Sequence, residues 1–266
     1  FLGIIILIFF SSLSEKNLFR LSVYLFFISL FFLFLVPIIG AEVKGAKRWL
    51  DLLFLPRFQP IEIVKPFTII FLAIILSTEK NIHIYYKYFI SFIAIVPVSL
   101  LLMMQPDIGQ TILIFISWIT LVFISGISLM VFLIFFGFSL ISLIYMVFHI
   151  PKFSYIKSRI DSFFNPDTGT HNAQVTKSID GISSGGFFGK GIGEGTLKNR
   201  VPEAHTDYII SVISEEFGVI AIILILLLFL TFIYSVFKKV YFENEEKTKL
   251  ILVGCISLIL MQAMIH

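Results

Sequence analysis

The sequence predicts an all-α, polytopic integral membrane protein, and three observations support this fold class. Apolar residues make up 58% of the 266-residue chain, and its mean hydropathy is +1.00. Soluble domains contain roughly 45 to 50% apolar residues. The apolar residues form continuous runs close to the ~20 residues that cross a hydrocarbon core as a helix. These runs also lack the period-two alternation that is typical of a membrane β-barrel.

About eight such runs follow one another and are separated by polar connections. They cover approximately residues 1–10, 21–39, 60–77, 88–104, 108–125, 130–150, 208–236 and 249–266. The first run begins without a methionine and the last stops in mid-helix, so we expect the sequence to be an internal piece of a longer protein. Residues 1–266 are expected to form a single membrane domain.

Residues at the starts of several runs favour helix initiation. Pro60 suits the first turn of a helix, where its missing N–H has no intrahelical partner. Asp107 and Asp207 directly precede apolar runs, and Asp is a preferred N-cap because its side chain accepts from free backbone N–H groups. The Gln105-Pro106-Asp107 sequence therefore predicts a tight turn between two antiparallel helices.

The alternation of helices assigns the polar connections to two sides of the membrane. One side carries residues 11–20, 77–87 and 238–249, and the other carries 40–59, the 105–107 turn and the segment 151–207. The short connections contain eight Lys and Arg on the first side and five in the 40–65 region of the second. Long loops translocate largely regardless of charge. We therefore expect the first side to be cytoplasmic and the segment 151–207 to be external.

The segment from Pro151 to Asp207 is predicted to be a long external loop that carries the active site. Its 57 residues are many for a connection between membrane helices, and loops of this length are usually functional. Seven glycines lie between Gly181 and Gly195. A flexible linker is one interpretation of this stretch, but Phe187 and Phe188 favour packing or insertion at the membrane interface.

Asp207 is the candidate catalytic residue, with simple helix capping as the alternative. Ser211 and Glu215 follow at i+4 and i+8, so a polar stripe continues into the predicted membrane helix. Polar groups at that depth usually face a cavity or a partner. Glu215 lies roughly 12 Å along the helix axis from Asp207, which excludes proton sharing between them. His205 and Glu203 are further candidates, although surface hydrogen bonding would also explain them.

Several cations on the external side are candidates for contacts with an anionic substrate. Lys47 and Arg48 precede Trp49, a combination that is also typical of interfacial anchoring. Arg159 and Lys190 lie in the long loop. Glu62 and Lys65 stand at positions i and i+3, so they share a helix face. A local ion pair between them is the alternative to substrate binding.

Composition and motif spacing disfavour several other classes of function. The single cysteine, Cys255, lies inside a predicted helix and offers no disulfide or cysteine-based metal site. The net charge is +3 and there is no basic tract suited to nucleic acid. The Gly185–Gly191 sequence lacks the glycine spacing and the Ser or Thr of a phosphate-binding loop, so no nucleotide is expected. No internal repeat is evident, which disfavours an inverted-repeat transporter.

Six separated motifs, read in order along nearly the whole chain, resemble the SEDS family (shape, elongation, division and sporulation). They are Gly45-Ala46-Lys47-Arg48-Trp49, Gln59-Pro60-Ile61-Glu62, Gln105-Pro106-Asp107-Ile108-Gly109, Arg159 with Phe163 and Pro166, Ser184-Gly185-Gly186-Phe187-Phe188-Gly189, and Pro202-Glu203-Ala204-His205-Thr206-Asp207. The glycine pattern from Gly189 to Gly195, together with Ala204 before His205, is more similar to the division branch of the family than to the elongation branch.

The resemblance implies a fold of ten membrane helices, of which this sequence would lack the first and the last. It also implies polymerisation of lipid II into peptidoglycan strands outside the bacterial cytoplasmic membrane, at the division septum. The implied partners are a class B penicillin-binding protein and other division proteins, besides undecaprenyl-pyrophosphate-linked glycan. The family's essential aspartate falls on Asp207, and a divalent cation, Mg or Mn, would bridge the pyrophosphate, with Asp207 as a metal contact.

Two positions depart from the family pattern. Ile61 replaces the usual Ser of the Gln-Pro-Ser-Glu motif, and Asn199 stands where division members often carry an acidic residue. Both departures leave Asp207 in place, although the second bears on how activity is regulated.

Three other functions remain open from the residues alone. A flippase or transporter for lipid-linked precursors would tolerate Asp207 and Glu62 as intramembrane polar sites. A membrane scaffold for division proteins would need neither residue. An elongation-type polymerase is the third alternative.

The topology predicts that an Asn172→Cys variant exposes its thiol outside the cell, because Asn172 lies in the external segment 151–207. The new cysteine should react with an impermeant thiol reagent in intact spheroplasts. Labelling that occurs only after lysis would reverse the assigned orientation.

Overall fold

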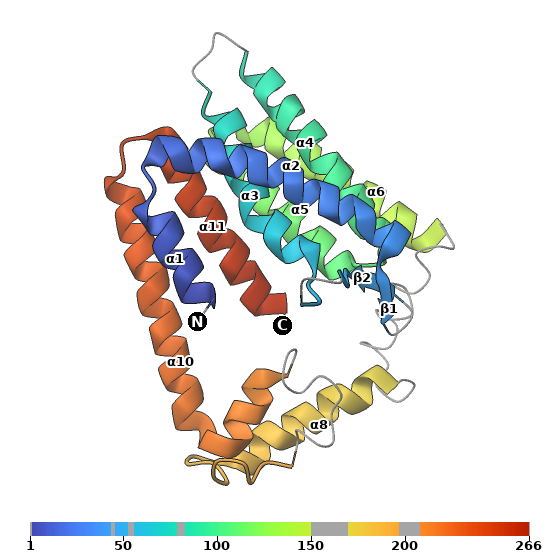
Figure 1. Cartoon of the computed structure of the whole chain (residues 1–266), viewed down its shortest axis with the longest axis vertical. Helices are drawn as coiled ribbons and strands as arrows, with labels where there is room; N and C mark the ends of the chain where they lie inside the picture. Colours follow the sequence, from blue (N-terminus) through green and yellow to red (C-terminus); the bar gives the residue numbers. More distant parts are fainter. Residues whose placement is uncertain are drawn as a thin grey trace. The chain divides into compact units, whose positions relative to one another are not determined.

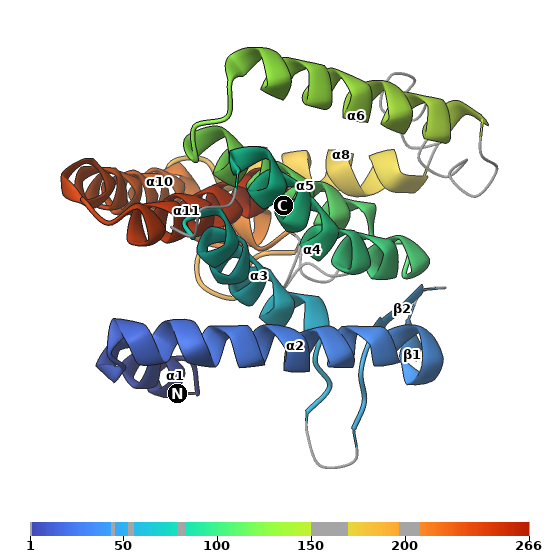
Figure 2. The same ribbon diagram turned by 90° about the horizontal axis from the view of Figure 1, so that it is seen from above.

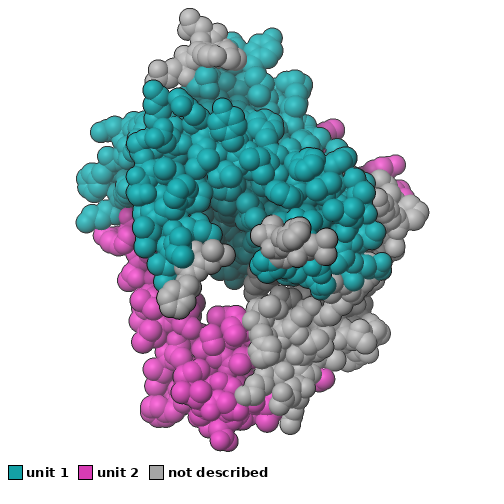
Figure 3. Space-filling view, viewed as in Figure 1, with its two compact units in different colours: residues 1–127, 236–265 teal, residues 128–235, 266 magenta. Residues whose placement is uncertain are grey.

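The computed structural model describes residues 2–43, 46–52, 56–78, 83–149, 170–196 and 208–265. The chain divides into two compact units, coloured separately in Figure 3. Unit 1 contains residues 1–127 and 236–265, and unit 2 contains residues 128–235 with residue 266. All eight predicted apolar helices are present, so the helical prediction is confirmed.

Unit 1 contains six of these helices and a small hairpin (Figure 1, Figure 2). The elements are α1 (Leu2–Ser12), α2 (Glu15–Ile39), β1 (Ala41–Val43), β2 (Ala46–Trp49), α3 (Pro60–Leu76), α4 (Ile84–Met104), α5 (Ile108–Ile124) and α11 (Glu246–Ile265). Pro60 occupies the first turn of α3 and Asp107 caps α5, as the sequence predicts.

The core of unit 1 lies among α2, α3, α4, α5 and α11, which contact one another. α3 contributes Ile61, Val64, Leu72 and Ala73, all fully buried. A polar group in such a core needs a hydrogen-bond partner, because its burial without one is costly. The Trp118 ring N–H, for example, donates to Ser91 Oγ at 3.0 Å and joins α5 to α4.

The hairpin departs from the all-α prediction. β1 and β2 pair antiparallel, with Glu42 opposite Lys47 and Val43 opposite Ala46. A further bridge between Leu50 and Phe58 extends this structure beyond the strands. The connection from α2 to α3 is therefore ordered around short backbone pairings in its described parts.

Unit 2 contains α6 (Leu129–His149), α8 (Thr170–Gly185) and the greater part of α10 (Ile209–Phe242). α8 lies within the segment 151–207, so the predicted connection between membrane helices contains a helix of its own. Its buried positions include Ser178, Gly181 and Gly185, which recur at helical spacing. The glycine-rich turn that follows α8 contacts α10 through its backbone.

α10 is broken at Gly218, whose backbone is non-helical at φ 78° and ψ −178°. A continuous helix would bond Val219 N–H to the Glu215 carbonyl and Ile220 N–H to the Glu216 carbonyl. Instead, Val219 N–H donates to the Gly186 carbonyl at 3.0 Å, and Ile220 N–H donates to the Phe187 carbonyl at 3.4 Å. Figure 1 shows the resulting change of direction near the N-terminal end of α10.

The two carbonyls that the break releases are also satisfied by the glycine-rich turn. Lys190 N–H donates to the Glu215 carbonyl at 2.9 Å, and Gly191 N–H donates to the Glu216 carbonyl at 3.1 Å. Four hydrogen bonds to the turn thus replace two helical ones. Gly218 and Gly189 both have positive φ, and a Cβ at either position would collide with backbone of the other segment. Their lack of side chains permits this contact.

Four described helices are long and apolar enough to cross a membrane: Glu15–Ile39, Ile84–Met104, Ile209–Phe242 and Glu246–Met264. Their number is consistent with a multi-pass protein. Phe187 and Phe188 are 74% and 84% exposed, so of the two alternatives, packing or interfacial insertion, only the second fits them. Their insertion at the interface stays a prediction.

Replacement of Gly218 by Ala should destabilise the protein, because its φ and ψ are accessible essentially only to glycine, a strain of about 1 to 3 kcal/mol, and because the Cβ would strike the Phe187 carbonyl. We expect a lower thermal midpoint in detergent. Gly137→Ala is the matched control, since a Cβ added at that position in α6 would meet open space. Equal midpoints for the two variants would contradict the role of the break.

Candidate functional site

The predicted site residues fall into three groups. Lys47, Arg48, Glu62 and Lys65 lie in unit 1, and Lys190 lies in unit 2. The remaining ones, which include the candidate base, lie outside the described residues: Arg159, Glu203, His205 and Asp207.

Arg48 joins the hairpin to the turn between α4 and α5. Its Nη2 donates to the Pro106 carbonyl at 2.7 Å, and its Nε lies 3.4 Å from the Gln105 carbonyl and 3.7 Å from Asp107 Oδ2. Asp107 in turn accepts from Gln59 Nε2 at 3.4 Å. Three motifs that are separate in sequence therefore converge. The Arg48 side chain remains 35% exposed, while the neighbouring Lys47 is exposed on the hairpin.

Glu62 and Lys65 form the ion pair that their spacing indicates, with Lys65 Nζ 2.7 Å from Glu62 Oε2. The Lys65 ammonium also donates to Gln262 Oε1 of α11 at 2.9 Å, and the Lys65 side chain is only 2% exposed. Glu62 is 46% exposed and additionally contacts Gln110 at 3.5 Å. Lys65 is thus enclosed by its partners, whereas Glu62 is accessible.

Gln262 is a site residue that the sequence analysis did not single out, although a signal was present. It is a polar residue inside the otherwise apolar run at the end of α11. Polar residues in membrane helices usually face a partner in the bundle, and here that partner is Lys65.

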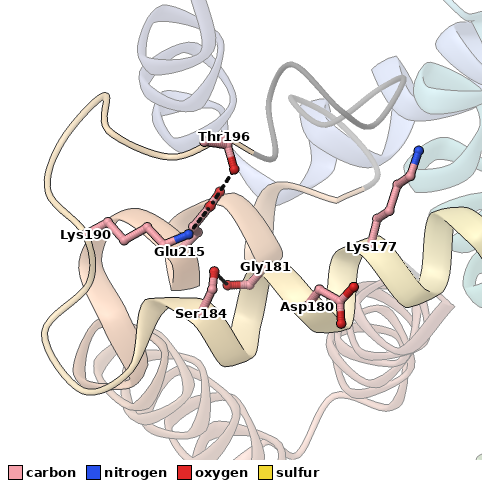
Figure 4. Close-up of a pocket in the computed structure, with 7 residues that line it drawn as sticks. All are labelled: Lys177, Asp180, Gly181, Ser184, Lys190, Thr196 and Glu215. Carbon is pink, nitrogen blue, oxygen red and sulfur yellow. Dashed lines mark hydrogen bonds and ion pairs between the residues drawn. The ribbon is translucent and has the colours of Figure 1, made fainter.

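In unit 2, Glu215 is the centre of a second polar cluster (Figure 4). Its side chain is 2% exposed and its Oε1 accepts from Lys190 Nζ at 2.7 Å and from Thr196 Oγ1 at 3.2 Å. Ser211, one turn earlier, is also buried. The polar stripe predicted to follow Asp207 is therefore confirmed as buried, and Glu215 faces both partners and a cavity.

The cavity beside Glu215 measures about 140 Å³, and most of the side chains that line it carry polar or charged groups (Figure 4). Its lining comes from α8, the glycine-rich turn and α10: Lys177, Asp180, Gly181, Ser184, Lys190, Thr196 and Glu215. Lys177, Asp180 and Ser184 are spaced so that they lie on one face of α8. The sequence analysis did not identify this helix. The cavity offers hydroxyl, ammonium and carboxylate groups, which suit a hydrogen-bonding ligand.

Within the described ranges, no three His, Cys, Asp or Glu side chains are grouped so that they could hold a metal ion. Asp207, the predicted metal contact, is not among those residues. The divalent cation therefore stays a prediction.

The family model and the most similar proteins that were found all belong to one family. The family model for cell cycle proteins of the FtsW, RodA and SpoVE type matches residues 1–266. A probable peptidoglycan glycosyltransferase FtsW from Buchnera aphidicola subsp. Schizaphis graminum is 34% identical over 242 residues, which are 88% of this chain and 66% of that protein. The Caulobacter vibrioides protein of the same name is 32% identical over 211 residues, 79% of this chain and 53% of its own length. The chain thus spans between about half and two thirds of these relatives.

Solved structures share the fold. A chain from a peptidoglycan synthase complex, described for its coordination of polymerization and crosslinking, aligns with a TM-score of 0.78 at 25% identity and covers 98% of this chain and 74% of that one. The Thermus thermophilus rod shape determining protein RodA aligns with a TM-score of 0.68 at 24% identity, over 99% of this chain and 70% of that one. From its match to the family model over residues 1–266 and its agreement with these folds, the chain belongs to the FtsW, RodA and SpoVE family of membrane proteins, the SEDS family.

Proposed function

We propose that this chain has the function of a peptidoglycan glycosyltransferase that polymerises lipid II during cell division. The observation that carries the proposal is the family match over residues 1–266, together with relatives that are named peptidoglycan glycosyltransferase FtsW. The convergence of Arg48, Gln59 and Asp107 from three separate motifs supports a functional assembly. The division role follows the names of the relatives and the glycine pattern of the long segment.

The proposed reaction has simple demands. The 4-hydroxyl of the acceptor sugar attacks the anomeric carbon of the donor strand, a C–O bond forms there, and the bond to undecaprenyl pyrophosphate breaks. A base must accept the hydroxyl proton, and cations must stabilise the charge on the departing pyrophosphate. Asp207 is the proposed base. Arg48, whose side chain is partly exposed, and Arg159 are the proposed pyrophosphate contacts. Lys47 is adjacent to Arg48 in the sequence, and His205 lies in the same motif as Asp207.

The remaining parts of the proposal concern partners and place. A class B penicillin-binding protein would cross-link the strands, and the similarity to a peptidoglycan synthase complex supports such a partner. A divalent cation held by Asp207 would supply further charge for the leaving group. The protein would act at the septum in the cytoplasmic membrane.

The Asp207→Asn variant should lose polymerisation while it keeps its fold. Asn caps a helix about as well as Asp, but it cannot accept the proton, so strand synthesis should fall by ~10²- to 10⁴-fold. The measurement is polymerisation of labelled lipid II by the purified full-length protein with its partner. Asp51→Asn is the control, because Asp51 is an exposed carboxylate in the predicted external connection. Near-normal synthesis by Asp207→Asn would reopen the transporter and scaffold functions.

The Arg159→Ala variant should reach the membrane but turn over slowly, since charge-assisted contacts to phosphate are about twice as strong as neutral ones. We expect at least a ~10-fold loss of polymerisation, the equivalent of about 1.4 kcal/mol. Arg57→Ala removes a cation whose ion pair with Asp51 is on the surface, and it should behave like wild type. If the two variants are equally active, Arg159 serves as an anchor only.

A further inference from the structure

The break at Gly218 makes the start of α10 a separate piece of helix. Residues 209–217 precede the break, and the long apolar part of α10 follows it. Because the helical hydrogen bonds across the break are replaced by bonds to the glycine-rich turn, the long part does not fix the direction of the short one. Other contacts must hold the short piece, which begins two residues after Asp207 in the chain.

Glu215 provides several of these contacts. Its carbonyl accepts from Lys190 N–H at 2.9 Å, and its carboxylate accepts from the ammonium of the same lysine at 2.7 Å. The carboxylate also accepts from Thr196 at 3.2 Å. One residue of the short piece thus holds both ends of the turn from Lys190 to Thr196.

Because the Glu215 carboxylate is buried, its stability depends on its ion-pair partner. The Glu215 side chain is 2% exposed and the Lys190 side chain is 37% exposed. A buried carboxylate is strongly destabilising when its partner is removed, whereas the paired state is tolerated. Any phosphate that bound the Lys190 ammonium would have to compete with a carboxylate already 2.7 Å away. The geometry therefore favours a contact inside the protein over a contact with the leaving group.

We propose that Glu215 and Lys190 are positioning residues for glycosyl transfer. Their ion pair, with the backbone bonds of the glycine-rich turn, locks the short piece of α10 in one orientation and so fixes the helix start that follows Asp207. The proposal rests on the proposed polymerase function, and it assigns Lys190 a role different from the pyrophosphate contact predicted from sequence.

Activity measurements distinguish the two roles of Lys190. In the full-length protein with its partner, Glu215→Gln and Lys190→Met should each lower the maximal rate of lipid II polymerisation by ~10²-fold, a loss typical of a displaced catalytic group. KM should change little. The combined variant should be no worse than Lys190→Met alone, because coupled residues are not additive. Lys190→Arg should restore most of the rate, since it keeps the charge.

A direct contact with pyrophosphate predicts another pattern. Lys190→Met would then abolish synthesis, while Glu215→Gln, which releases the ammonium, would leave it intact or faster. That result overturns the proposal. Glu194→Gln is the matched control, because Glu194 is an exposed carboxylate in the same turn, and it should leave the rate unchanged.

Hydrogen exchange tests the lock without any need for catalysis. The amides of Lys190 and Gly191, which donate to Glu215 and Glu216, should exchange at least ~10-fold faster in Glu215→Gln than in wild type or Glu194→Gln. Unchanged exchange would refute the lock even if activity falls. Faster exchange in Glu215→Gln, combined with a wild-type protein that polymerises no lipid II, would leave the lock standing and reject the polymerase function, which separates the two failures.

Discussion

The exchange of backbone hydrogen bonds at Gly218 is the constraint on which unit 2 depends. A backbone N–H or C=O group that is shielded from water needs a partner within the protein, so a broken helix persists only where other protein groups supply one. The glycine-rich turn does this with two carbonyls and two N–H groups placed in the register of the missing helical turn. The positions of Gly189 and Gly218 follow from this need, because backbone must approach backbone without a Cβ between them. The turn and the helix therefore specify one another.

Each of the two units stabilises one buried charged side chain by pairing it with a more exposed, oppositely charged one. Lys65 in unit 1 and Glu215 in unit 2 are each almost fully buried, and each contacts both an oppositely charged side chain and a neutral one. In both ion pairs the partner is the more exposed member. Such pairs place a charge inside a helix bundle at a modest cost in free energy, because the more exposed member, Glu62 or Lys190, is not removed from polar surroundings. They also connect segments that are far apart in the chain.

The sequence predicted the parts of the fold that hydrophobicity determines. Every apolar run is a helix. α10 continues beyond the predicted run to Phe242, because the long side chains of Lys238 and Lys239 can reach a polar boundary from an apolar surface. α8 was not predicted because its three apolar residues at helical spacing, Val175, Ile179 and Ile182, are too few to form a membrane-crossing run, and its buried positions are small residues such as Ser178 and Gly181. The hairpin was missed because its strands are short and its position is set by Arg48, whose partners are 57 and 58 residues away. Spacing identified the Glu62–Lys65 pair, but no local pattern indicated that Lys190 belongs to Glu215.

The contact between Lys65 and Gln262 has a consequence for synthesis of the protein. It joins residues 197 positions apart, and α11 also packs against α3 and α5. Unit 1 is therefore interrupted in the chain by residues 128–235 of unit 2, and its last helix emerges from the ribosome after them. Between the end of α5 at Ile124 and the start of α11 at Glu246 lie 121 residues (246 − 124 − 1), about 6 to 24 s of translation at typical rates. During that interval Lys65 has no contact with Gln262, and the surfaces of α3 and α5 that α11 later covers are still without that helix.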